Sequence, residues 1–168
     1  LIQEEEVVIT VTHTGYIKRT ALSTYRSQRR GGKGRIGHTP RAEDAVQHVF
    51  VASTHDYILV FTSAGKVHWL KVYRIPNLGR SAVGRAAVNL LPGFSPEDSI
   101  QAVIPVRSFD EGTLLFCTAK GIVKRTPLSD YRRPKAGGII AIGLDEGDRL
   151  IDVAVANDDD EIVLGSRS

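Results

Sequence analysis

The chain has 168 residues, of which 42% are hydrophobic and 24% charged, and its formal net charge is +3. These proportions match ordinary globular domains and exclude an intrinsically disordered or low-complexity protein. No uncharged stretch is longer than residues 86–96, which is far shorter than the roughly 18 apolar residues of a membrane-spanning helix. The length corresponds to about one domain, and the absence of methionine predicts a fragment of a longer protein. One cysteine and an acidic start favour the cytoplasm.

Short apolar runs recur along the chain and predict an all-β fold. They are rich in β-branched and aromatic residues and are bounded by Gly, Asp, Asn and Ser, as strands are. No window shows the long period of 3.6 residues that is typical of helices. In chain order the runs cover residues 7–11, 48–52, 57–61, 102–106, 114–117, 152–156 and 162–164.

The sequence also repeats internally. Residues 14–26 (TGYIKRTALSTYR) match residues 120–132 (KGIVKRTPLSDYR), and residues 64–74 (AGKVHWLKVYR) are a weaker copy between them. A period near 50 residues with about four strands per copy indicates a propeller-like array of blades. We therefore interpret residues 1–168 as one domain. Its predicted repeats cover approximately residues 7–45, 46–99 and 100–149, and a fourth begins within residues 150–168.

Charged residues alternate in blocks along the chain. Residues 7–42 and 57–96 contain cations and no acidic residue, and residues 112–144 contain six cations and one acidic residue. If the copies stack as blades, equivalent loops lie on the same rim and the three blocks form one basic belt. A single block would be explained equally well by a hydrated surface without a function.

The segment Gln28-Arg29-Arg30-Gly31-Gly32-Lys33-Gly34 suggests a phosphate-binding site. Its glycines let backbone N–H groups approach an anion, and its cations supply forked and point-charge donors. The alternative is a flexible loop with hydrated cations. Residues 32–37 also match G-x-G-x-x-G, but without the flanking strand and helix of a dinucleotide site. Because the histidines and Cys117 lack metal-ligand spacing, we expect no cofactor and no metal.

This heptapeptide resembles the signature box of the C-terminal domain of the DNA gyrase A protein. The flanking residues 15–19 and 88–92 extend the resemblance, which covers essentially the whole chain. It implies a partial β-pinwheel, in which neighbouring propeller-like blades exchange strands. We expect about three four-stranded blades and the first strand of a fourth. The C-terminal domain of topoisomerase IV is an alternative, but its box is degenerate or missing.

The resemblance implies sequence-independent binding and wrapping of double-stranded DNA on a basic rim. This wrapping would support ATP-dependent negative supercoiling by the whole enzyme, formed with the remainder of the gyrase A protein and with the gyrase B protein. The catalytic tyrosine, the ATP site and the magnesium carboxylates belong to those other parts, so no catalytic residue is expected here. A protein-binding propeller scaffold is the competing hypothesis. Self-association through exposed strand edges is a further expectation for a partial disk.

The candidate DNA-binding residues form two groups. Matched to the family's box position by position, the first group is Gln28, Arg29, Arg30, Gly31, Gly32, Lys33 and Gly34. The second group contains cations from the three basic blocks, which would continue the DNA path along the rim. These are Lys18, Arg19, Arg35, Arg74, Arg80, Arg85, Lys124, Arg125, Arg132, Arg133 and Lys135.

Overall fold

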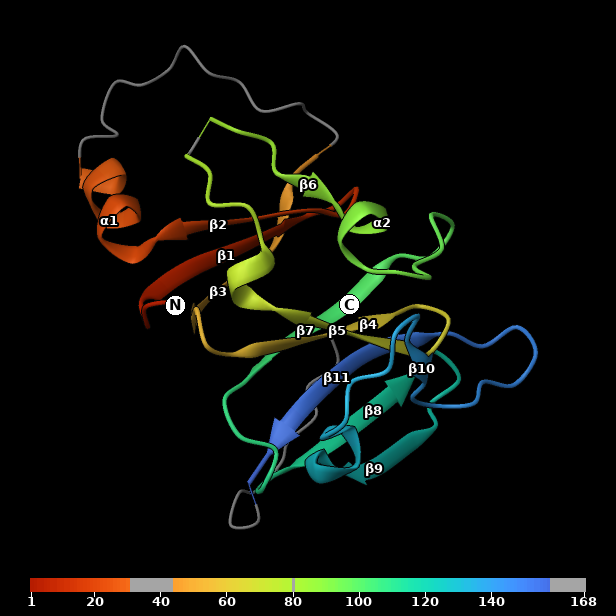
Figure 1. The fold of residues 1–168 in the computed structure, drawn as a ribbon. Helices are drawn as coiled ribbons and strands as arrows, with labels where there is room; N and C mark the ends of the chain where they lie inside the picture. Colours follow the sequence, from red (N-terminus) through yellow and green to blue (C-terminus); the bar gives the residue numbers. More distant parts are fainter. Residues whose placement is uncertain (31–43, 80, 158–168) are drawn as a thin grey trace.

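The computed structural model describes residues 1–30, 44–79 and 81–157, and for residues 28–30 it describes the backbone alone. In these residues the strands form three antiparallel sheets, which Figure 1 shows one above another. The first sheet has the order β3 (Val46–Ser53), β1 (Glu6–Thr12), β2 (Tyr16–Ala21), β6 (Arg85–Ala86). The second has the order β10 (Ile139–Ile140), β5 (Lys66–Lys71), β4 (Tyr57–Thr62), β7 (Ile100–Val106). The third has the order β11 (Leu150–Ala156), β8 (Thr113–Thr118), β9 (Val123–Pro127).

Each sheet is built around a hairpin with the same turn. In the first hairpin the Gly15 N–H donates to the Thr12 carbonyl (3.0 Å), and the Thr12 hydroxyl accepts from the Tyr16 N–H (3.0 Å). Gly15 has a φ of +88°, a backbone conformation that residues with a Cβ atom rarely adopt. The same contacts recur at Thr62, Gly65 and Lys66 and at Thr118, Gly121 and Ile122. The repeated sequence thus encodes a repeated structure.

Neighbouring repeats exchange short strands. β6 follows β5 in the chain but pairs with β2 of the first sheet, and β10 follows β9 but pairs with β5 of the second. In addition, β3 pairs with β1 along its whole length, whereas β4, which begins four residues after β3 ends, belongs to the second sheet. The repeat boundaries expected from the sequence stay a prediction, and the apolar run at residues 162–164 lies outside the described residues.

The second sheet has both faces buried between its neighbours. Leu59 and Phe61 of β4 pack toward the third sheet, where the rings of Phe61 and Phe116 meet edge to face at 5.5 Å. Ile58 and Val60 point the other way and join the core shared with the first sheet. This two-sided burial explains why residues 57–61 form a continuous apolar run and not an alternating one. Each such side chain stabilises the fold by about 1.5–3 kcal/mol.

The predicted all-β, propeller-like fold class is confirmed, although the described residues also contain helices that the sequence did not predict. α1 (Leu22–Arg30) follows β2 directly, and its apolar contacts come from Leu22 and Tyr25. Two apolar positions are too few to reveal a helical period. Three shorter elements complete the described part: α2 (Ala87–Leu90) and the 3₁₀ turns η1 (Val72–Arg74) and η2 (Leu128–Tyr131). No described helix is long and apolar enough to cross a membrane.

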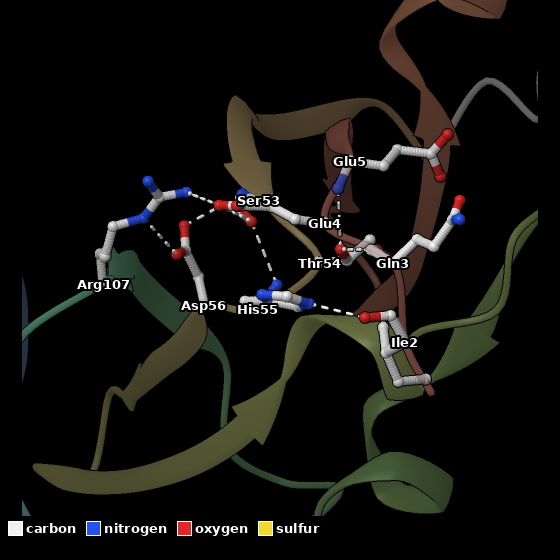
Figure 2. A network of polar contacts seen from close by, with 9 residues as sticks. All are labelled: Ile2, Gln3, Glu4, Glu5, Ser53, Thr54, His55, Asp56 and Arg107. Atoms are coloured by element: carbon white, nitrogen blue, oxygen red, sulfur yellow. Dashed lines mark hydrogen bonds and ion pairs between the residues drawn. The ribbon is translucent and has the colours of Figure 1, made fainter.

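A polar network joins the N-terminal segment to the turn between the first two sheets (Figure 2). The Thr54 hydroxyl donates to the Gln3 carbonyl at 2.7 Å. Arg107, at the end of β7, pairs with Glu4 at 2.7 Å and with the buried Asp56 at 3.3 Å. These contacts fix the first residues against the corner where the chain passes from β3 to β4.

Candidate nucleic-acid interface

The heptapeptide box begins in the last turn of α1, which contains the backbone of Gln28, Arg29 and Arg30. The rest of the box, Gly31, Gly32, Lys33 and Gly34, lies outside the described residues, as do Arg35 and Arg80. α1 leaves the end of β2 at one side of the first sheet (Figure 1). Leu22, Tyr25 and Arg26 of this helix line a groove of about 420 Å³ over the outer face of the first sheet.

Lys18, Arg19 and Thr20 in β2 hold the loop between η1 and β6 against the first sheet. Lys18 Nζ donates to the carbonyls of Gly79 (3.0 Å) and Ala82 (2.8 Å). Arg19 Nε donates to the Ile75 carbonyl at 2.7 Å, and the Thr20 hydroxyl donates to the Leu78 carbonyl at 2.9 Å. Lys18 and Arg19 are half-buried and thus have a structural role that charge counting did not predict. Their DNA contacts stay a prediction.

In the second sheet, a residue of β5 at the position equivalent to Arg19 also holds a later segment through a hydrogen bond to a backbone carbonyl. Trp69, which lies four residues after the turn glycine as Arg19 does, donates its Nε1–H to the Tyr131 carbonyl at 2.8 Å. Lys66 Nζ adds a contact to the Gly137 carbonyl at 3.4 Å. The internal repeat could have predicted this contact, because it aligns Trp69 with Arg19, whose side chain also donates to a backbone carbonyl.

The cations predicted in the third sheet and its connections are exposed. Lys124 Nζ donates to the Ala141 carbonyl at 2.9 Å. Arg132 forms an exposed ion pair with Asp110 at 2.8 Å. Arg125, Arg133 and Lys135 are also exposed, as are Arg74 and Arg85 from the second repeat. The structure therefore leaves most of the predicted rim cations accessible to a ligand.

Arg74 and Lys135 come together at a groove between the second and third repeats, here called the inter-sheet groove. It has a volume of about 230 Å³ and is also lined by Tyr57, Trp69 and Lys71. Lys71 Nζ lies 5.7 Å from the ring centroid of Tyr57, and none of the described residues that line the groove is acidic. Lys71 was not among the predicted DNA-binding residues, because its position opposite Tyr57 depends on the strand register, which the sequence does not show.

Two titratable groups have shifted pKa values: His68, which lines the groove, and Tyr73, which lies beside Lys71 and Arg74. Hydrogen bonds from Arg74 and then Lys71 lower the pKa of the Tyr73 hydroxyl. Burial lowers the pKa of His68, and the charge of Lys66 adds to this effect, whereas Asp98 and the Pro92 carbonyl oppose it. The Nε2 atom of His68 is buried and has no hydrogen-bond partner among the described residues. Nearby cations contribute to both shifts, Arg74 and Lys71 at Tyr73 and Lys66 at His68, whereas burial lowers the pKa of His68 alone.

The groups that commonly hold a metal do not gather in the described part of the chain. Among residues 1–30, 44–79 and 81–157, no cluster of three or more His, Cys, Asp or Glu side chains could bind a metal ion. The described arrangement consists of exposed cations and aromatic rings. Its chemistry suits the binding of anions.

Comparison with protein families gives three matches in one family. The sequence profile described as DNA gyrase C-terminal domain, beta-propeller, matches residues 6–53, 56–107 and 112–157. Each range begins at or next to the first strand of a hairpin (β1, β4 or β8) and ends at or next to the long strand that pairs with it (β3, β7 or β11).

Curated relatives and solved structures agree with this match. The DNA gyrase A protein of Salmonella typhimurium is 46% identical over 99% of this chain and 19% of the relative. That of Clostridium acetobutylicum is 47% identical over 98% of this chain and 20% of the relative. The chain thus spans about a fifth of these relatives. The C-terminal domain of DNA topoisomerase IV superposes with a TM-score of 0.75 at 27% identity, covering 92% of this chain and 47% of that structure. A DNA gyrase A C-terminal domain superposes with a TM-score of 0.64 at 19% identity, covering 92% and 49%.

Proposed function

Because the chain belongs to the DNA gyrase C-terminal domain family, we propose that it binds double-stranded DNA without sequence preference and wraps or bends it along a basic rim. It acts as a non-catalytic part of a DNA gyrase. Its partners are DNA, the remainder of the gyrase A protein and the gyrase B protein, and the whole enzyme uses ATP and magnesium at other sites. The bacterial relatives support a cytoplasmic site of action.

One observation supports this proposal: in each repeat, cations follow the second strand of the hairpin. The exposed ones are Arg26 in the first repeat, Arg74 in the second, and Arg132 and Arg133 in the third, and the half-buried Lys71 ends β5. Equivalent strand ends in stacked sheets lie along one side of the stack. Cations at these positions can therefore contact successive phosphates of one DNA segment.

Wrapping of this kind depends on phosphate contacts and not on base recognition. Smooth bending costs about 1–6 kcal/mol for a site of 20–30 base pairs, which the additional contacts must offset. If about six phosphates are neutralised, the logarithm of the binding constant falls with the logarithm of salt concentration with a slope near −5. A fourfold rise in salt would then weaken binding about 10³-fold.

The test is DNA binding by the 168-residue chain, measured by anisotropy across a range of salt concentrations, with bending measured by energy transfer between labelled DNA ends. The R29A/R30A/K33A variant should bind more weakly and lose bending. The control K120A/R149A should retain both, since its residues lie away from the ends of the second strands. Unchanged bending by the first variant, with circular dichroism showing a folded chain, would refute the role of the box.

A topoisomerase IV C-terminal domain is the second candidate, favoured by the structural match at 27% identity. The intact box and the curated gyrase relatives favour gyrase. Failure of the folded chain to bind DNA at low salt would instead favour the protein-binding scaffold.

A further inference from the structure

We propose that the inter-sheet groove is a specific binding site for a DNA backbone phosphate, which Lys71, Arg74 and Lys135 contact together. This inference rests on the proposed DNA binding and assigns to it a contact made by residues of two neighbouring repeats. Lys71 and Arg74 lie at the end of β5 and in η1, whereas Lys135 lies in the segment that leads from η2 to β10. One phosphate would therefore link the two repeats at the place where they exchange a strand.

The three repeats show that the fold itself does not require this set of cations. Tyr57 faces Lys71 across the β4–β5 hairpin, whereas the equivalent pairs are Val7 with Ala21 and Thr113 with Pro127. The Tyr73-Arg74 pair that follows has counterparts in the other repeats, Tyr25-Arg26 and Tyr131-Arg132. Among the described residues, the pairing of an aromatic ring with Lys71 is thus particular to the second repeat and indicates a role other than folding.

Aromatic rings hold the cations in place without neutralising them. Lys71 Nζ lies between the rings of Tyr57 (5.7 Å) and Tyr73 (5.6 Å), and the Arg74 guanidinium lies 6.0 Å from the Tyr73 ring. Such cation–π contacts orient a charged group and leave its donors available. Lys71, Arg74 and Lys135 form no ion pair with a carboxylate of the described residues. A phosphate would relieve their mutual repulsion and accept charge-assisted hydrogen bonds.

Close backbone packing fixes the third cation. A Cβ added at Gly138 would lie 2.8 Å from Cε1 and Nδ1 of His68, so the 134–138 segment packs directly on this buried ring. Lys66 Nζ also binds the Gly137 carbonyl at 3.4 Å. The segment carrying Lys135 is thereby placed on β5 before any ligand arrives. Preorganisation of this kind lowers the ordering cost of binding.

The groove contains its own reporter, because Trp69 is the one tryptophan of the chain and lines it. We would titrate the chain with a duplex of about 20–30 base pairs and follow Trp69 fluorescence together with the anisotropy of the labelled DNA. The two signals should saturate at the same DNA concentration. In K71A/R74A the Trp69 response should disappear, affinity should fall about tenfold, and the salt slope should decrease by about 0.9, the value for one phosphate.

The K120A/R149A variant is the matched control, since it removes one lysine and one arginine near the turn end of the third hairpin. It should keep the Trp69 response and the salt slope. If K71A/R74A binds DNA with the same salt slope and Trp69 response as the parent chain, the phosphate-binding site is refuted and the proposed function is not affected. A folded parent chain that binds no DNA at low salt would overturn both.

Discussion

The Thr20 hydrogen bond provides a quantitative test of how neighbouring repeats are joined. Thr20 is 5% exposed, and its hydroxyl donates to the Leu78 carbonyl at 2.9 Å. Replacing it with valine keeps the shape and removes the donor, which should cost about 1 kcal/mol. At an m-value of about 1–3 kcal/mol/M in urea, the unfolding midpoint should fall by about 0.3–1 M.

Thr126 is the internal control for this change, because it is the equivalent residue of the third repeat. It is 7% exposed, and its hydroxyl has no partner in hydrogen-bonding geometry among the described residues. T126V should therefore leave the midpoint unchanged or raise it, since it removes a buried unsatisfied group. Urea unfolding followed by Trp69 fluorescence and circular dichroism measures both variants. Equal decreases in T20V and T126V would refute the assignment of the T20V effect to the Leu78 contact.

Two further predictions concern the inter-sheet groove. G138A should destabilise the chain more than G121A in thermal unfolding: both glycines have positive φ, but a Cβ at 138 meets His68 at 2.8 Å whereas none of the described atoms lies within 4 Å at 121. Comparable losses in the two variants would contradict the packing argument. Because burial lowers the pKa of His68 below 6.5, the unfolded chain binds the proton more readily, and stability should fall as pH decreases through and below about 6.5. H68Q should flatten this part of the pH profile, and an unchanged profile would contradict the argument.

Local sequence patterns predicted β1, β3, β4, β7, β8 and β11, but no apolar run marked β2, β5 or β9. The runs at residues 7–11, 57–61 and 114–117 became β1, β4 and β8, because a strand buried on both faces requires nearly continuous apolar side chains. The turn glycines were equally informative, since a left-handed backbone favours glycine. In contrast, β6 and β10 have two residues each and carry no periodicity. Their partners are chosen by tertiary packing.

Site prediction was limited by what a charge pattern records. Lys18 and Arg19 were predicted as rim cations, yet both donate to carbonyls of the loop between η1 and β6. The sequence alone does not distinguish a hydrated lysine or arginine from one whose side chain donates to backbone carbonyls. The inter-sheet groove could not be predicted for another reason: Arg74 and Lys135 are far apart in the chain, and Lys71 gains its aromatic neighbour through strand register.

The exchanged strands also determine how the chain can unfold. β6 joins the second repeat to the first sheet through backbone hydrogen bonds, and β10 joins the third repeat to the second sheet in the same way. In simple repeat arrays, neighbours are joined by packed interfaces, and units can open one at a time from an end. Here the opening of the second or third repeat also strips a strand from the sheet before it. We therefore expect adjacent sheets to unfold together as one cooperative unit.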